Sequence, residues 1–375
     1  MLGWPRIARA QRRSDPVQYY DGRMNDLAAI ARAMPKVLLH EHLDGGLRVA
    51  TLFELLHARG LAVPAADVAG LAAWFDERAH AGSLTDYLRG FALTVAAMAS
   101  PQALERVAFE AAEDAREDGC VLAEFRIAPL LFEPFGVEGE AAIEALLAGL
   151  AKSALPSGLI VCAMRHLPPR DTLRAAQLAL RYQGRGVVGF DLAGAEFGHP
   201  PGNHARALAL CRDAGLPLTL HAGEADGAAR VVEAVHLGAR RIGHGVRLVD
   251  VLDDPLHKAW IDDIRARDVH FEVCPTSNLH TGAAASIAAH PITALWRAGL
   301  SLSFHTDNRL MSRITPSEEA LALLQQTSLV ASDLLRMGLE AAHHSFLGAA
   351  ARLSAAEQVK RWADGAGLPL PSAAL

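Results

Sequence analysis

The sequence contains only four cysteines, and their spacing excludes two classes of protein. Cys120, Cys162, Cys211 and Cys274 lie far apart and form no C-x-x-C pair. This spacing argues against both a zinc ribbon and the disulfide framework of a small secreted domain. We therefore expect reduced thiols and a cytoplasmic protein.

Basic clusters and long apolar runs are also missing. The net charge of −6 is spread over the chain without a basic block, which argues against a broad interface with DNA or RNA. The N-terminal segment carries several arginines but no apolar core of signal-peptide length, and no later segment runs about 18 residues without a charge. We expect neither export nor a membrane span. A small-molecule enzyme fits this composition best.

The chain is rich in apolar residues, which make up 51% of its 375 residues, enough for one large barrel or two ordinary domains. A helical pattern opens at Met24, so residues 1–23 are expected to be an N-terminal extension and residues 24–375 a single domain. Short apolar runs alternate with alanine- and leucine-rich stretches of helical period, as in parallel βα units. The predicted strands cover residues 37–42, 120–127, 159–165, 187–192, 217–221, 240–245, 269–274 and 300–305.

Eight strands with helices between them and no Pro/Ser linker indicate an α/β fold, a (β/α)8 barrel of the TIM type. Two doubly wound domains are the alternative. Extra helices are expected after the first strand, within residues 45–119. In one of them Leu84, Tyr87, Leu88 and Phe91 share an apolar face. That face either packs on the barrel or forms a lid over its mouth.

Polar side chains follow the ends of the predicted strands, where active sites of this fold form. His40 and His42 are two residues apart in a strand, so they point to the same side. His221 and Asp307 end later strands. Three imidazoles and one carboxylate suit a single Zn²⁺ that keeps one position open for water, and the metal lowers the pKa of that water. We therefore predict one zinc per chain, bound by His40, His42, His221 and Asp307.

Two further polar residues have competing interpretations. His244 lies between two glycines and is expected to act on the water as a base or an electrostatic stabiliser, with metal ligation as the alternative. Glu224 follows His221 by three residues and is the best-placed carboxylate for delivering a proton to a substrate nitrogen. Its alternative is a carboxylate that stabilises a helix N-terminus.

Six ordered motifs together resemble the adenosine deaminase family of metal-dependent hydrolases. They are PKVLLHEHLDGG at 35–46, GFDLAGAE at 189–196, LHAGE at 220–224, RIGHGVR at 241–247, EVCPTSN at 272–278 and TDN at 306–308. The resemblance spans about residues 35–345. It implies the zinc ligands named above, protonation of purine N1 by Glu224 and attack of water at C6. It also implies that His244 orients this water and that Asp307 shares its proton.

The resemblance also implies a set of substrate contacts. The backbone N–H of Gly194 is expected to contact purine N3, and Asp44 to accept a hydrogen bond from the ribose 5′-hydroxyl. His42 is expected to border the substrate, and Leu84 and Leu88 to belong to a hydrophobic lid over the nucleoside.

Two positions depart from the family pattern. Many members carry an Asp that contacts purine N7 where this chain has Asn308, but an amide NH2 can also donate to unprotonated N7. His305 stands where Asn is frequent, and we expect it in the pocket wall. The remaining histidines, among them His166 and the pair His343 and His344, fit no strand-end pattern and are expected to be structural or on the surface.

The expected function is zinc-dependent hydrolytic deamination of adenosine and 2′-deoxyadenosine to inosine and 2′-deoxyinosine with release of ammonia, in purine salvage. The nearest alternative is a deaminase of another 6-aminopurine: adenine, a 5′-modified adenosine or aminodeoxyfutalosine. Asp44 favours a nucleoside, because adenine-specific relatives tend to carry the longer Glu there. A non-catalytic binding protein and a metal hydrolase acting on an amide or ester are more distant alternatives. The expected partner is a purine nucleoside, and the sequence does not predict the oligomeric state.

Overall fold

The computed structural model describes residues 27–79, 84–368 and 370, without the side chains of Ala79 and residues 84–89. The expected N-terminal extension of residues 1–23 lies outside these residues. So do the side chains of Leu84, Tyr87 and Leu88, on which the predicted lid depends.

Eight parallel strands form one sheet in which each strand pairs with the next in sequence. The predicted (β/α)8 barrel is therefore confirmed, and each predicted strand is present with its ends shifted by a few residues at most. The strands are β1 (Lys36–His42), β2 (Cys120–Ile127), β3 (Ser157–Met164), β4 (Val187–Ala193), β5 (Leu218–Ala222), β6 (Ala239–His244), β7 (His270–Val273) and β8 (Ser301–Phe304).

The last strand returns to the first at the carboxyl end of the barrel. The backbone N–H of His42 donates to the carbonyl oxygen of Asp307 at 2.7 Å, and the N–H of Asp307 donates to the carbonyl oxygen of His40 at 3.0 Å. A bridge between Glu41 and Asp307 continues this pairing. The seam of the barrel is thus formed by residues that the sequence predicts to bind metal.

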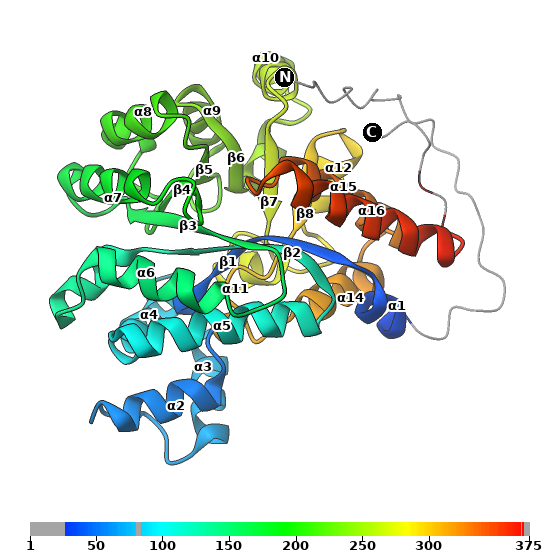
Figure 1. Ribbon diagram of the computed structural model, residues 1–375. Coiled ribbons are helices and arrows are strands. Elements are labelled where there is room, and N and C mark those ends of the chain that lie inside the picture. Colours follow the sequence, from blue (N-terminus) through cyan, green and yellow to red (C-terminus); the bar gives the residue numbers. More distant parts are fainter. Residues whose placement is uncertain (1–26, 80–83, 369, 371–375) are drawn as a thin grey trace.

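Helices surround the strands (Figure 1), as expected for parallel βα units. The α-helices are α1 (Leu27–Ala33), α2 (Val49–Ala58), α3 (Val68–Ala79), α4 (Leu84–Met98), α5 (Pro101–Glu117), α6 (Gly139–Leu150), α7 (Pro169–Arg181), α8 (Ala205–Asp213), α9 (Ala228–His236), α10 (Lys258–Ala266), α11 (Pro275–His280), α12 (Ile292–Arg297), α13 (Arg309–Ser312), α14 (Pro316–Gln326), α15 (Ala331–His344) and α16 (Ala349–Gly365). Short 3-10 helices are η2 (Leu43–Gly45), η3 (Pro129–Phe135), η4 (Pro201–His204), η5 (Val246–Val251) and η6 (Pro255–His257). No helix in the described part of the chain combines the length and the hydropathy needed to cross a membrane.

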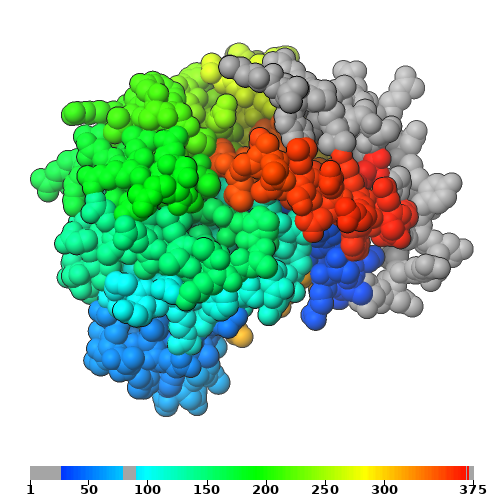
Figure 2. Space-filling view, viewed as in Figure 1, coloured from blue at the N-terminus to red at the C-terminus, as the bar shows by residue number. Residues whose placement is uncertain are grey.

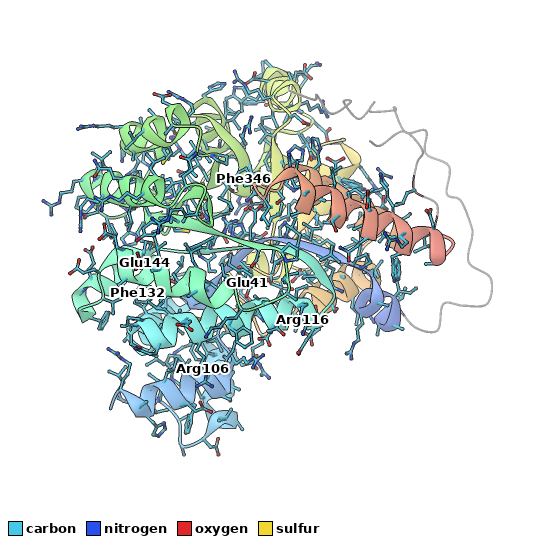
Figure 3. The ribbon with its side chains drawn as sticks, in the orientation of Figure 1. Glu41, Arg106, Arg116, Phe132, Glu144 and Phe346 are labelled. Carbon is cyan, nitrogen blue, oxygen red and sulfur yellow. The ribbon has the colours of Figure 1, made fainter. Side chains whose placement is uncertain are left out.

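Four α-helices, α2 to α5, lie between β1 and β2 in the chain. The part that contains α2 and α3 forms a lobe at the lower edge of the molecule (Figure 2). Arg106 of α5, labelled in Figure 3, ties this lobe to the barrel. Its guanidinium donates to Glu54 of α2 and to Glu110 of its own helix, each at 2.8 Å.

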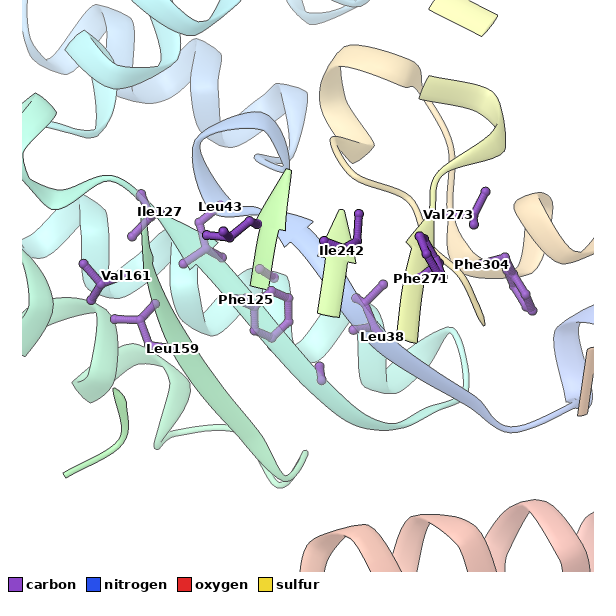
Figure 4. Packing of buried hydrophobic residues seen from close by; sticks show 14 of the residues in the cluster. Leu38, Leu43, Phe125, Ile127, Leu159, Val161, Ile242, Phe271, Val273 and Phe304 are labelled. Atoms are coloured by element: carbon purple, nitrogen blue, oxygen red, sulfur yellow. The ribbon is translucent and has the colours of Figure 1, made fainter. Parts of the chain in front are cut away.

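The strands alternate apolar and charged residues, although both kinds are buried. Figure 4 shows Phe125 and Ile127 of β2 and Phe271 of β7 packed among other apolar side chains. Arg126, which lies between Phe125 and Ile127, and Glu272, which follows Phe271, are also completely buried. Successive side chains of a strand point to opposite faces, so one face of these strands packs in the apolar core and the other places charges inside the barrel.

Candidate active site

The predicted site residues meet at the carboxyl ends of the strands. His40 and His42 end β1, His221 lies in β5, His244 ends β6 and Asp307 follows β8. The backbones of His244 and Asp307 are left-handed, with φ of 63° and 62°. For a residue other than glycine this conformation costs about 1 kcal/mol or more, and such strain gathers at functional sites.

Four side-chain atoms form a compact group of metal-ligand type. The Nε2 atoms of His42 and His221 are 3.1 Å apart, and Asp307 Oδ1 lies 3.2 Å from His40 Nε2 and 3.5 Å from His42 Nε2. Neighbouring ligands of a tetrahedral zinc ion with bonds of about 2.0–2.1 Å are about 3.3 Å apart. Among the described residues, His40 Nε2 and Asp307 Oδ1 are buried without a hydrogen-bond partner. The donor set therefore fits a zinc ion.

Carboxylates behind two of the imidazoles fix the protonation of each ring. His40 Nδ1 lies 2.7 Å from Glu272, and His221 Nδ1 lies 3.0 Å from Asp191. An ionised carboxylate only accepts hydrogen bonds, so each Nδ1 carries the proton and each Nε2 presents its lone pair to the group. Carboxylates that do not contact the metal themselves commonly orient metal-binding histidines in this way.

A buried arginine joins these two carboxylates. Arg126 donates to Asp191 at 2.9 Å and to Glu272 at 2.6 Å, and all three side chains have no solvent exposure. Burial by itself would raise the pKa of Glu272, but the charges of Arg126 and Arg241 outweigh it and hold that pKa well below its usual range. Sequence reasoning did not identify Glu272, Asp191 or Arg126 as supports of these histidines. The sequence did contain a signal for these three residues, because each is a charged residue between two apolar residues of a strand.

A chain of hydrogen bonds determines which nitrogen of His244 is protonated. Burial lowers the pKa of His290 to about 3, so this ring is neutral. Its Nδ1 accepts from the backbone of Ile292 at 3.0 Å, so its Nε2 donates to Asn278 Oδ1 at 3.2 Å. The amide of Asn278 then donates to His244 Nδ1 at 3.1 Å.

His244 therefore carries its proton on Nε2, which lies 3.6 Å from Glu224. A protonated nitrogen is not a metal ligand. Although His244 lies close enough to His40, His221 and Asp307 to be grouped with them as a ligand, the hydrogen bonds favour His42 as the third imidazole.

Glu224 is held in place by hydrogen bonds to Glu196, which follows β4, and to Thr281, which follows α11. The carboxylate of Glu196 accepts from the backbone N–H groups of Gly223 and Glu224 at 2.5 and 2.9 Å. The hydroxyl of Thr281 donates to the Glu224 carboxylate at 2.8 Å. Glu224 precedes α9 by four residues, because that helix begins at Ala228. It is therefore not a first-turn carboxylate of that helix.

Asp307 remains ionised in spite of its burial. Burial alone would raise its pKa, but the adjacent imidazole of His40, with His244 and His42 nearby, holds the pKa well below its usual range. Its second oxygen accepts from the hydroxyl of Ser277 at 2.6 Å. Oδ1 is left to face the histidines.

A pocket of about 300 Å³ opens beside this group, a volume at the lower end of small-molecule sites. Its lining includes most of the predicted site residues, namely His42, Asp44, Gly194, His221, Glu224, His244, Asp307 and Asn308, and Phe91 of the predicted apolar face. His40 lies behind them and is completely buried.

Three predicted substrate residues present distinct features to the pocket. Gly194 has φ of 89°, and a Cβ there would meet His166 Nδ1 at 2.9 Å, so glycine lets its backbone face the cavity. Asp44 Oδ1 and Asn308 Oδ1 are buried without a partner among the described residues. Burial raises the pKa of Asp44 to about 7.

One sequence prediction about a histidine is wrong. His166, expected to be structural or on the surface, is exposed and also borders the pocket. His305, expected in the pocket wall, lies inside the barrel, where its ring bonds Ser303 at 2.7 Å and accepts from the backbone of Leu39 at 3.2 Å. His305 directly follows a buried strand, and its side chain continues the inward face of β8.

Comparisons with known proteins agree on one family. Residues 35–362 match the family model described as adenosine deaminase. The chain is 42% identical over 348 residues to an adenosine deaminase of Mycobacterium avium, covering 88% of this chain and 94% of the relative. It is 43% identical over 344 residues to the adenosine deaminase of Mycolicibacterium vanbaalenii, with the same coverage.

Solved structures share the fold at lower sequence identity. The adenine deaminase of Arthrobacter aurescens has a TM-score of 0.79 at 23% identity and covers 88% of this chain and 100% of its own. An amidohydrolase from Burkholderia ambifaria with bound zinc has a TM-score of 0.78 at 22% identity, over 94% of this chain and 98% of its own.

Proposed function

Because this chain belongs to the adenosine deaminase family, we propose that it hydrolyses adenosine and 2′-deoxyadenosine to inosine and 2′-deoxyinosine with release of ammonia. It is a hydrolytic deaminase. The observation that carries the proposal is the position of Glu224, which lines the same pocket as His42, His221 and Asp307. A proton donor and a metal-ligand set therefore share one cavity of nucleoside-binding size.

The metal in this proposal is zinc, one ion per chain, held by His40, His42, His221 and Asp307. The spacing of the donors and the lone pairs on His40 and His221 support it. When bound, zinc supplies Lewis-acid activation of water. A relative of the same fold whose structure contains bound zinc adds support.

The protein's own side chains divide the proton transfers between them. Glu224 donates a proton to purine N1, which makes C6 more electrophilic. The Nε2–H of His244 orients the attacking water by donating to its oxygen. Asp307, ionised at the same cavity, accepts the proton that the water loses and passes it to the 6-amino group, so that the C6–N bond breaks and ammonia leaves. The hydroxyl left on C6 returns a proton to Glu224. Thr281 holds the Glu224 carboxylate in place for the first of these steps.

The polar groups of the pocket fit a nucleoside. Asp44 accepts from a ribose 5′-hydroxyl and the N–H of Gly194 donates to purine N3, while Asn308 lies where it can contact N7. His42 and the apolar Phe91 border the substrate. Sequence reasoning adds Leu84 and Leu88 of α4 as lid residues. We propose purine salvage as the context.

The same lining argues against a nucleotide substrate. None of the described residues that line the pocket is a lysine or an arginine, the side chains that bind phosphate groups. Asp44 would also repel a 5′-phosphate whenever it is ionised. The second candidate is a different uncharged 6-aminopurine, such as adenine, whose deaminase from Arthrobacter aurescens shares the fold.

The expected setting is the cytoplasm, and the four cysteines are free and buried, as expected for reduced thiols. The partner is a small molecule rather than a nucleic acid or a membrane. The deciding experiment incubates the zinc-loaded protein with adenosine, 2′-deoxyadenosine, adenine and AMP, and follows the ultraviolet absorbance change together with ammonia release. We expect turnover of the two nucleosides and none of AMP. Preference for adenine, or no ammonia from any compound, would contradict the assignment.

A further inference from the structure

A second group of metal-ligating side chains lies at the opposite end of the barrel. Asp268 precedes β7, and His343 and His344 end α15. The two carboxylate oxygens of Asp268 lie 3.9 Å from His343 Nε2 and 4.0 Å from His344 Nε2. Because the strands run from this end towards the active site, the barrel separates this group from the pocket.

Histidines in the last turn of a helix often serve the helix itself, by hydrogen bonding its last carbonyl groups or by placing charge at its negative end. Here arginines already do so. Arg352 donates to the carbonyl oxygen of His343 at 3.1 Å, and Arg241 donates to that of His344 at 3.2 Å. The two imidazoles are therefore not needed at these carbonyl groups, and both lie against Asp268 instead.

The surroundings of His344 show which residues can supply metal ligands. His270 stacks on its ring, with centroids 4.7 Å apart and planes 16° from parallel. Both ring nitrogens of His270 are already hydrogen-bonded, to Ser301 at 2.9 Å and to Ser303 at 2.7 Å. His270 therefore supports the ring of His344 but does not supply a ligand. Glu340 lies 3.9 Å from His344 Nε2 and adds negative charge beside it.

We propose that Asp268, His343 and His344 form a second transition-metal site, which takes Zn²⁺ through two imidazole nitrogens, one carboxylate oxygen and water. This donor set is typical of zinc. The spacings of 3.9 and 4.0 Å are too long for hydrogen bonds, and they exceed the ligand spacing of a zinc ion by about half an ångström. Small rotations of the imidazoles close the site around an ion.

The second site binds zinc more weakly than the active site. Its side chains are partly exposed, 59% for Asp268 and 28% for His343, so water competes for the ion. The site should therefore fill only after the active site, when free zinc is present.

The test counts metal directly. Zinc-loaded protein is dialysed to equilibrium against rising free Zn²⁺, and bound zinc is measured by elemental mass spectrometry. Wild type should take up one zinc per chain beyond the active-site ion. Asp268→Asn and His343→Gln should lose it, and both should keep the deaminase activity. Asn suits position 268 because its φ of 56° is one that Asn tolerates.

His236→Gln is the matched control. His236 Nε2 lies 3.1 Å from Asp263, and no third donor is grouped with this pair in the described part of the chain. The control should keep the second zinc, and so should Glu224→Gln, which separates this proposal from the deaminase function. A wild-type protein that saturates without a second zinc would overturn the proposal. Retention of the second zinc by both Asp268→Asn and His343→Gln would overturn it equally.

Discussion

The Nδ1 atom of His40 lies 2.7 Å from a carboxylate oxygen of Glu272, and neither side chain is exposed to solvent. Glu272 does not line the pocket, so its influence on the reaction must pass through the imidazole that it orients. Arg126 extends this relationship to Asp191 and His221. Two of the three histidines proposed to bind zinc, His40 and His221, are thus held by one network inside the barrel.

Glu272→Gln should weaken zinc binding by roughly ten- to a hundredfold, the usual effect of removing a carboxylate behind a metal-binding histidine. Because the amide of Gln can donate as well as accept a hydrogen bond, it no longer requires His40 Nδ1 to carry the proton. Zinc release into a colorimetric chelator measures the effect without any substrate. Glu319→Gln is the control, because Glu319 is equally buried but hydrogen bonds the backbone of Thr276 rather than a histidine. Equal release rates for both variants would exclude the positioning role.

Wild-type protein should retain about one tightly bound zinc per chain after dialysis against a weak chelator. His221→Ala and Asp307→Ala should each remove both this zinc and the activity, because the remaining three donors cannot hold the ion in the same geometry. Elemental analysis and adenosine turnover are measured on the same preparations. Full activity after metal removal, or a variant that keeps the ion and the activity, would contradict the ligand assignment.

Glu224→Gln should keep its zinc and lose at least about a hundredfold in kcat, the scale of a positioned general acid. The amide has the same shape but cannot deliver the proton to N1. Asp226→Asn changes a carboxylate of the same loop and should leave kcat nearly unchanged. If Glu224→Gln and Asp226→Asn turn over adenosine equally fast, Glu224 is not the proton donor.

Asp44→Ala should reduce kcat/KM for adenosine while leaving the slower reaction of 5′-deoxyadenosine nearly unchanged. Above the pKa of Asp44, about 7, the carboxylate is ionised. A hydrogen bond to a charged acceptor contributes on the order of 1.5–3 kcal/mol, which corresponds to a loss of roughly ten- to a hundredfold. Initial rates on both substrates provide the comparison, with 5′-deoxyadenosine as the internal control. Equal losses on the two substrates would instead assign Asp44 a role in organising the nearby histidines.

Glu319 should make stability depend on pH. Burial raises its pKa from an ordinary 4.5 to about 8, so the native state holds this proton more tightly than the unfolded state. The stabilisation from this group is complete below about pH 4.5 and is lost as the pH rises towards about 8. Glu319→Gln removes the titration, so its stability relative to wild type should increase by up to a few kcal/mol between about pH 5 and about pH 9. Urea unfolding at both pH values measures the change, and parallel behaviour of the two proteins would disprove it.

The sequence predicted the strands and the ligand-type residues because each depends on local pattern. The apolar run that ends in His40 and His42 is visible in a few residues, and so is the strand that ends in His221. The carboxylates that orient these histidines do not show in a local pattern. Glu272, for example, follows His40 by 232 residues. Its role appears only when the barrel closes, because closure leaves one strand, β8, between β7 and β1.

The composition of the pocket wall was missed for the same reason. His166 lies two residues after β3, but nothing in its neighbours indicates that it reaches the cavity beside Gly194. His305 lies in a site motif, yet its side chain points into the barrel. The direction of a loop side chain depends on packing against distant segments, which a single sequence does not specify.

The seam between His42 and Asp307 also has a consequence for synthesis of the chain. His40, His42 and His221 leave the ribosome long before Asp307, so a nascent chain carries the imidazoles but neither the carboxylate nor the hydrogen bonds that close the sheet. Until then β1 is an edge strand with unpaired backbone groups, which invite pairing with other chains. A chain that terminates early therefore lacks both the closed sheet and the carboxylate that we propose as a metal ligand. Truncated products are expected to aggregate rather than to persist as partly active enzyme.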